Sequence, residues 1–271
     1  MRKSFVERSI DGLLEAMERA LYAESMAGRG GFLQRLDPRV KVAGLGGLIV
    51  TAALSSRLIV IAAVFAIAIA LAAFSRVSIA TLASNVWIEA FAFTGAIAVP
   101  AIFITPGRVV YEIPILNWTV TAQGFTSAAY LILRVETAAT LSLLLIFTTP
   151  WTHVLKALRI FRVPVVFVVV LGMTCRYILL MLESAREMFD SRKSRTVGVL
   201  SGPDRRRMAV ATAGVMLSKS FQMSGEVYLA MQARGFRGEV YLLDDFRMRG
   251  LDWIALAGFA GASAIALWAS R

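Results

Sequence analysis

Residues that build disulfides and metal centres are scarce in this chain. Its 271 residues include one cysteine, Cys175, and one histidine, His153. A single cysteine excludes a disulfide framework within the chain. Transition-metal sites need clustered His, Cys or carboxylate ligands. We therefore expect no disulfide and no metal site built by this chain alone, and we assign it no cofactor.

Catalytic motifs are missing as well. The sequence contains no GxxxxGK[ST] loop to hold a nucleotide phosphate, no nucleophile elbow and no HExxH zinc motif. A Ser-His-Asp triad would have to use His153, which lies close to Trp151 in a basic segment and which we interpret as an interfacial histidine. We expect that the chain is not an enzyme and does not hydrolyse ATP itself.

Acidic residues are outnumbered by basic ones, 18 against 29, which leaves a formal net charge of +11. In a soluble protein this excess would suggest nucleic acid as a partner. Here 58% of the residues are hydrophobic and they gather in long runs typical of membrane spans. The positive-inside rule places basic loops on the cytoplasmic side. We therefore predict a lipid bilayer, and not nucleic acid, as the surroundings of this chain.

The hydrophobic runs predict an all-α polytopic membrane protein with about five spans plus two long helices on the cytoplasmic side. The whole chain, 1–271, is expected to form a single membrane domain. Its segments are an amphipathic N-terminal part (1–36, with a helix near 9–27), spans 1 to 4 (37–148), the cytoplasmic-side coupling helices (149–240) and a last span (251–270).

Local signals place several helix boundaries. Asp37 is a good N-cap and Pro38 suits the first helical position. Two short apolar helices, about 42–54 and 58–74, are expected to form a hairpin, with glycines at 44, 46 and 47 allowing close approach. Further spans are expected at about 84–105 and 125–148, separated by a loop at 106–124.

The apolar run at 164–182 is long enough to cross a membrane by hydropathy alone. Twelve Lys and Arg residues follow it between Arg186 and Arg249, and a crossing would place them outside. We therefore interpret 164–195 as one long helix of roughly 48 Å, with an embedded first half. A second long helix, about 206–233, is expected to pair with it after a turn at 196–204. Its apolar stripe runs from Val210 to Met231.

Three ionisable residues fall within predicted spans: Glu89, Arg134 and Glu136. Charged groups are costly in lipid and are expected to face protein or an interface. We interpret Arg134 and Glu136 as a local structural pair rather than a transport site.

Two arginines end the two long helices. Arg195 lies in Ser194-Arg195-Thr196, and Arg234 lies in Ala233-Arg234-Gly235, where Gly235 is the expected left-handed residue after a helix. The helix dipole accounts for any single arginine at such an end. Two of them on the same side would form a matched pair of prongs. Small neighbours would let each guanidinium enter a pocket and bind a carboxylate there with two hydrogen bonds.

The ordered set of motifs resembles the transmembrane T component of energy-coupling factor transporters, and within it the cobalt-type member CbiQ. The motifs are Leu36-Asp37-Pro38-Arg39-Val40-Lys41, Thr148-Thr149-Pro150, Pro164, Arg176-Tyr177, Ser194-Arg195-Thr196 and Ala233-Arg234-Gly235-Phe236. The resemblance implies two ATPase subunits and a substrate-binding membrane subunit (CbiM-like, with a small CbiN-like subunit) as partners. It also implies that Arg195 and Arg234 plug into grooves on the ATPases. Ser194-Arg195-Thr196 departs from the family's commoner Ala-Arg-Gly.

We therefore expect the energy-coupling subunit of an importer for cobalt or nickel, multi-pass in the bacterial inner membrane with a cytoplasmic N-terminus. A T component of a vitamin importer shares most of these motifs. A stand-alone secondary transporter, with Glu89, Arg134 and Glu136 lining a path, would be built from two related halves. We find no such internal repeat, and a membrane-embedded enzyme lacks a catalytic constellation.

Overall fold

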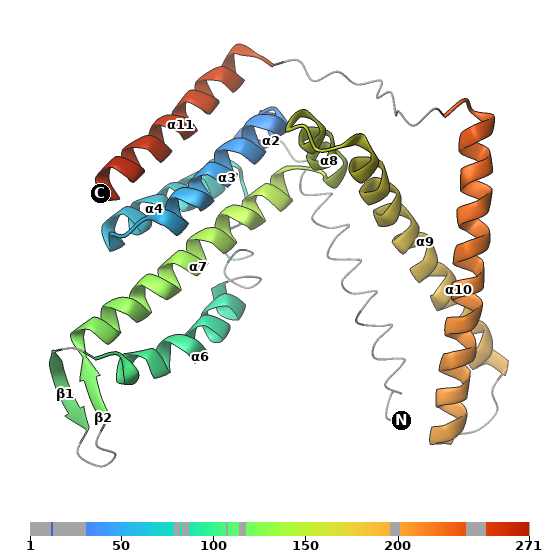
Figure 1. The fold of residues 1–271 in the computed structure, drawn as a ribbon, viewed down its shortest axis with the longest axis horizontal. Helices are drawn as coiled ribbons and strands as arrows, with labels where there is room; N and C mark the ends of the chain where they lie inside the picture. Colours follow the sequence, from blue (N-terminus) through green and yellow to red (C-terminus); the bar gives the residue numbers. More distant parts are fainter. Residues whose placement is uncertain are drawn as a thin grey trace. The chain divides into compact units, whose positions relative to one another are not determined.

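A computed structural model describes residue 12 and residues 31–78, 82, 87–106, 108–113, 118–195, 201–236 and 248–270. Helices make up nearly all of this part (Figure 1), which confirms the all-α class. The amphipathic helix predicted near 9–27 lies, apart from Gly12, outside the described residues. The chain divides into two compact units, which are taken separately below. The prediction of a single membrane domain stays a prediction.

The core unit comprises Ala23–Ala157 and Phe246–Arg271. Its elements are α2 (Phe32–Arg35), α3 (Pro38–Leu54), α4 (Leu58–Phe74), α6 (Ile88–Ile104), β1 (Val109–Ile113), β2 (Trp118–Thr121), α7 (Ala122–Thr148), most of α8 (Trp151–Ile160) and α11 (Gly250–Ser270). For α3, α4, α6, α7 and α11 these bounds agree to within a few residues with the helices predicted within 37–148 and near the C-terminus.

The start of α3 follows from its sequence. The Asp37 carboxylate accepts a hydrogen bond from the backbone N–H of Arg39 at 2.9 Å, and Pro38 occupies the first turn. This is the predicted cap, and it satisfies one of the backbone donors that a helix start leaves open. The start of α7 uses Thr121 in the same way, with its Oγ1 accepting from the N–H of Gly124 at 3.0 Å.

The apolar core lies between α3, α4, α7 and α11 (Figure 1). Leu45 and Leu48 of α3 and Leu141 of α7 are fully buried in it. A Cβ placed on Gly44 would lie 2.4 Å from Cδ2 of Phe259 in α11. Glycine at 44 thus permits a close helix approach, as predicted, but the partner is α11 rather than α4.

The segment expected as a loop at 106–124 contains a β-hairpin instead. Strands β1 and β2 pair antiparallel, with Tyr111 opposite Val120 and Ile113 opposite Trp118. Both strands are rich in β-branched and aromatic residues, which favour extended pairing. The prediction missed the hairpin because it weighed only the turn residues of this segment.

The second unit includes Leu158–Asp245 and contains the long pair, α9 (Val165–Arg195) and α10 (Gly202–Ala233). Both long helices are confirmed. The turn between them is shorter than predicted, because α10 already begins at Gly202 with Ser201 as its cap: Ser201 Oγ accepts from the N–H of Asp204 at 3.3 Å.

Three helices of the described chain are long and apolar enough to cross a membrane: α7, residues Val165–Arg192 of α9, and α11. Helix α4, with 17 residues, measures about 26 Å and is slightly short of a hydrocarbon core of about 30 Å. The chain is therefore a helical membrane protein. By length and composition α9 qualifies as a span, so its interpretation as a non-crossing helix stays a prediction.

Candidate coupling site on the two long helices

Arg234 is held by a specific helix ending. It is the C-cap of α10, and Gly235 follows it with a φ of 76°. The N–H of Gly235 donates to the carbonyl of Gln232 at 2.9 Å, and the N–H of Phe236 donates to that of Met231 at 3.0 Å. This pair of bonds is a Schellman motif. It confirms the left-handed glycine predicted at 235 and leaves Ala233 and Arg234 exposed.

Arg195 is the last residue of α9 and is likewise exposed. Ser194 before it donates its hydroxyl to the carbonyl of Ser191 at 2.8 Å, so that side chain is tied to its own helix. Thr196 lies outside the described residues. Within the part of the chain that the structure describes, no ion pair or hydrogen bond occupies the guanidinium of Arg195 or Arg234.

The two arginines do not form neighbouring prongs. Nη1 of Arg192 in α9 donates to the carbonyl oxygen of Met208 at 3.2 Å, and Nζ of Lys219 in α10 donates to Oγ of Ser184 at 2.8 Å. The later residue of α9, Arg192, bonds to the earlier residue of α10, Met208, and the earlier residue of α9, Ser184, bonds to the later residue of α10, Lys219. The two helices therefore run antiparallel (Figure 1).

Because of this direction, Arg195 lies where α10 begins and Arg234 lies where α10 ends. The 32 residues of α10 separate the two ends by about 48 Å. The expectation that both arginines lie together as neighbouring prongs is therefore wrong, because two antiparallel helices have their C-terminal ends at opposite ends of the pair. Each guanidinium is available to a separate carboxylate, and one shared pocket cannot hold both.

The apolar stripe predicted on α10 does not pack against α9 along its length. Val210, Leu217 and Phe221 are 73%, 60% and 72% exposed, respectively. Thr212 is instead the buried side chain of α10 among the described residues. The long pair thus presents apolar surface between its two arginine ends.

Arg134 and Glu136 do not form the predicted pair. Two residues apart on a helix place side chains about 200° apart around its axis. Arg134 instead donates from Nη2 to the carbonyl oxygen of Ser55 at 2.8 Å, and Tyr130 donates its hydroxyl to the carbonyl of Ser56. Arg134 therefore holds α7 against the end of α3.

Glu136 is buried, with 8% of its surface exposed. Its Oε2 atom has no hydrogen-bond partner within the described part of the chain. Glu89 lies at the start of α6, and its side chain is outside the described residues. Of the three, only Arg134 and Glu136 have described side chains, and the structure does not pair these two.

A buried polar cluster, here called the Asp252 cluster, was not predicted from the sequence. The N–H of Asp37 donates to Oδ1 of Asp252 at 2.8 Å, and the N–H of Arg249 donates to Oδ2 at 2.7 Å. Lys41 is 2% exposed, and its Nζ donates to the carbonyl of Thr148 at 2.8 Å. The carboxylates of Asp37 and Asp252 attract this buried ammonium. The cluster ties the starts of α3 and α11 to the end of α7.

Comparison with known proteins extends these observations to most of the chain. Residues 30–242 match the family described as cobalt transport protein, CbiQ. This chain belongs to the CbiQ family. The match includes both long helices and both arginines, and it confirms the family that the ordered motifs indicate.

Three relatives of this CbiQ-family chain have nearly equal sequence identity to it. An energy-coupling factor transporter transmembrane protein, EcfT, of Brevibacillus brevis is 28% identical over 225 residues, covering 77% of this chain and 82% of its own. The cobalt transport protein CbiQ of Rhodobacter capsulatus is 29% identical over 174 residues, covering 59% and 70%. An uncharacterised protein of Methanocaldococcus jannaschii is 29% identical over 245 residues, covering 89% and 83%.

Two of the motifs that carried the resemblance have a structural explanation. Residues 36–41 contain the cap of α3 and the buried Lys41 of the Asp252 cluster. Residues 233–236 form the Schellman motif that ends α10. Asp252 accepts from the N–H of Arg249, as the acidic residue of a capping box does, but Arg249 is not a capping residue, so the sequence contains no such signal.

Proposed function

We propose that this chain is the energy-coupling transmembrane subunit of an energy-coupling factor importer. In this role it receives motion from two ATPase subunits and passes it to a substrate-binding membrane subunit. The CbiQ-family match over residues 30–242 carries the proposal, together with relatives named as transporter transmembrane proteins. The chain itself is non-catalytic, since it lacks a phosphate-binding loop.

Arg195 and Arg234 are the proposed contacts with the ATPases. Both are exposed arginines at helix C-terminal ends, where Arg makes bidentate bonds to carboxylates in a partner's groove. A separation of about 48 Å along α10 is too long for one groove to hold both arginines, so we assign one ATPase subunit to each. The small, exposed residues Ser194, Ala233 and Gly235 leave room for the guanidinium groups to enter a groove.

The exposed apolar face of the long pair is the proposed contact with the substrate-binding membrane subunit. Phe221 and Leu217 present apolar area that a lipid-embedded partner would cover. Motion of either arginine end would tilt a rigid helix and so move this face. The partner is expected to be CbiM-like, with a small CbiN-like subunit.

We place the chain in the bacterial inner membrane, multi-pass, with a cytoplasmic N-terminus. The basic residues around the long pair favour the cytoplasmic side for its polar half. The proposed cargo is cobalt or nickel, and the family's description and the name of the Rhodobacter relative support cobalt. A vitamin is the alternative cargo, since the Brevibacillus relative carries a general transporter name.

Co-purification with the ATPase subunits tests this role. We expect Arg195→Glu and Arg234→Glu each to weaken ATPase binding by about 30-fold or more, as for a central arginine of an interface. Arg57→Glu, an equal charge change at an exposed arginine of the core unit, is the control and should bind normally. Normal ATPase binding by the double variant would overturn the coupling role.

The geometry also sets how the two effects combine. Sites more than 7–10 Å apart contribute additively, so the double variant should lose about the product of the two single effects. A strongly non-additive double variant would mean a shared pocket. Uptake of labelled cobalt, nickel and vitamins by the reconstituted complex identifies the cargo, and uptake by this chain without ATPases would favour a secondary transporter.

A further inference from the structure

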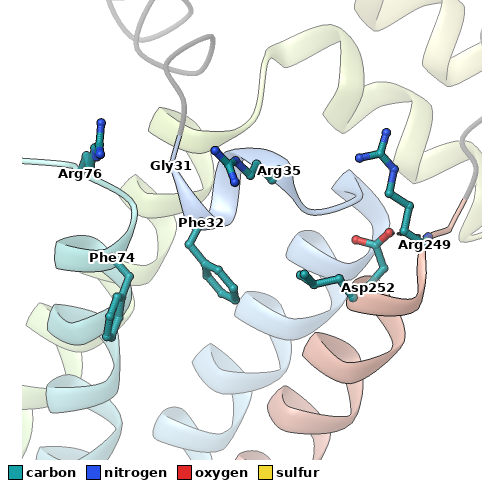
Figure 2. A pocket seen from close by; sticks show the side chains of 8 residues that line it. Gly31, Phe32, Arg35, Phe74, Arg76, Arg249 and Asp252 are labelled. Carbon is teal, nitrogen blue, oxygen red and sulfur yellow. Dashed lines mark hydrogen bonds between the residues drawn. The ribbon is translucent and has the colours of Figure 1, made fainter.

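A basic hollow lies in the core unit where α2, α4 and α11 meet. It has a volume of about 660 Å³, and Arg35, Arg76 and Arg249 line it (Figure 2). None of the three guanidinium groups has an ion-pair partner among the residues that the structure describes. Three positive charges around one hollow make an anion within it electrostatically favourable.

The one acidic residue lining the hollow does not neutralise these arginines. Asp252 is 3% exposed, and its two carboxylate oxygens already accept from the backbone N–H groups of Asp37 and Arg249. Its charge is also shared with the buried ammonium of Lys41. The hollow therefore keeps a net positive charge.

Arg76 occupies a backbone position that usually requires glycine. The N–H of Arg76 donates to the carbonyl of Ala73 at 3.2 Å, and the N–H of Val77 donates to that of Ala72 at 3.1 Å, so α4 ends in a Schellman motif. Arg76 is its left-handed residue, with a φ of 54°. This conformation is unfavourable for an L-residue. A strained arginine lining a hollow suggests that its side chain has a use there.

The other side of the hollow is apolar. Phe32 is 42% exposed and Phe74 is 72% exposed. In Figure 2 their rings lie toward the bodies of α3 and α4, while the three arginine side chains lie along the opposite rim. Trp253, in the first turn of α11, is 61% exposed. Exposed aromatic rings beside cations at the ends of apolar helices are typical of the layer where lipid headgroups meet the hydrocarbon core.

We propose that this hollow binds the phosphate of an anionic phospholipid, with Arg35, Arg76 and Arg249 on the headgroup and Phe32 and Phe74 against its acyl chains. Basic pockets at the ends of membrane helices bind anionic headgroups in this way. A phosphate has several oxygens for guanidinium hydrogen bonds. The two exposed rings favour a lipid over a free phosphate or an acidic peptide, which would leave them in water. The proposal does not depend on the transport role.

Native mass spectrometry of the full, delipidated chain in detergent tests the proposal. The probes are phosphatidylglycerol and phosphatidylcholine with the same acyl chains. We expect the most tightly bound phosphatidylglycerol molecule to bind at least ten-fold more strongly than the most tightly bound phosphatidylcholine molecule. Each arginine near an anionic headgroup contributes roughly a five-fold effect, so replacing all three with glutamine should weaken phosphatidylglycerol binding about 100-fold. Equal binding of the two lipids by the unaltered chain would overturn the proposal.

Matched variants separate a lipid site from general charge. Replacing Arg57, Arg108 and Arg206 with glutamine removes the same charge from exposed positions outside the hollow and should change the tightest binding by less than about three-fold. An equal loss in this control would mean that net charge, and not the hollow, binds the lipid. Displacement of the lipid by an excess of inorganic phosphate would identify a free-anion site and overturn the lipid assignment.

Arg76→Gly keeps the test valid if the triple variant does not fold. Glycine suits the left-handed position, so this variant should be at least as heat-stable as the unaltered chain without lipid. It should nevertheless bind phosphatidylglycerol about five-fold more weakly. Unchanged lipid binding by Arg76→Gly would show that Arg76 has no part in the site and would contradict the proposal.

Discussion

Removing the carboxylate of Asp252 should destabilise the core unit more than most single substitutions. In Asp252→Ala two backbone N–H groups, those of Asp37 and Arg249, lose their acceptor. Each hydrogen bond to a charged group contributes about 1.5–3 kcal/mol, so the free energy of unfolding should fall by roughly 3–6 kcal/mol. At roughly 2–3 °C per kcal/mol for a chain of this size, Tm should fall by roughly 6–18 °C.

Thermal unfolding in detergent measures this effect. Asp252→Asn retains one acceptor oxygen and should lose about half as much stability. Asp190→Asn is the control, because the Asp190 side chain is 69% exposed and its contact with Arg186 is a surface pair at 3.8 Å. Such a pair contributes about 0–1 kcal/mol. A Tm of Asp252→Ala within about 1 °C of the unaltered chain would refute the role of the Asp252 cluster in holding α3 and α11.

Lys41 provides an internal test of the same reasoning. Lys41→Met alone leaves the carboxylates of Asp37 and Asp252 buried with less compensation, and it should be destabilising. Combined with Asp252→Asn, it removes both charges of the attraction, so the double variant should lose less than the sum of the two single effects. Simple additivity would show that the two charges do not interact.

Six further substitutions have defined outcomes in the same unfolding assay. Gly235→Ala should cost about 1 kcal/mol because of its positive φ, whereas Gly214→Ala, in the interior of α10 with open space around it, should stabilise by a similar amount. Gly44→Ala should cost about 1–3 kcal/mol by overpacking, while Gly46→Ala should not. Glu136→Gln should keep the stability within about 1 kcal/mol, because no described residue donates to Oε2, and Glu136→Lys should prevent folding. A large loss of stability in Gly46→Ala or in Glu136→Gln would contradict these contacts.

The antiparallel long pair changes how force would enter the protein in the proposed role. With Arg195 and Arg234 at opposite ends of α10, two ATPase subunits would act on the two ends of the α9–α10 helix pair. A movement that brings the ATPases together would rotate the helix pair rather than translate it. The exposed apolar face between the ends is the part that such a rotation would reorient.

Short-range signals in the sequence were sufficient for the helices. Asp37 before Pro38 predicted the start of α3, and Gly235 predicted the end of α10, because a cap is made by residues within one turn of each other. The two long helices and the family were predicted correctly for the same reason, since a continuous helical pattern and an ordered set of short motifs can be read along the chain.

Only the tertiary structure decided which distant groups meet. Asp37 and Asp252 are separated by 215 residues along the chain, and Arg134 and Ser55 by 79. No local pattern encodes such pairs, so the sequence led us to pair Arg134 with its neighbour Glu136. The positions of Arg195 and Arg234 were misjudged likewise, because each helix end is a local property, whereas the direction in which two packed helices run depends on how the chain turns between them.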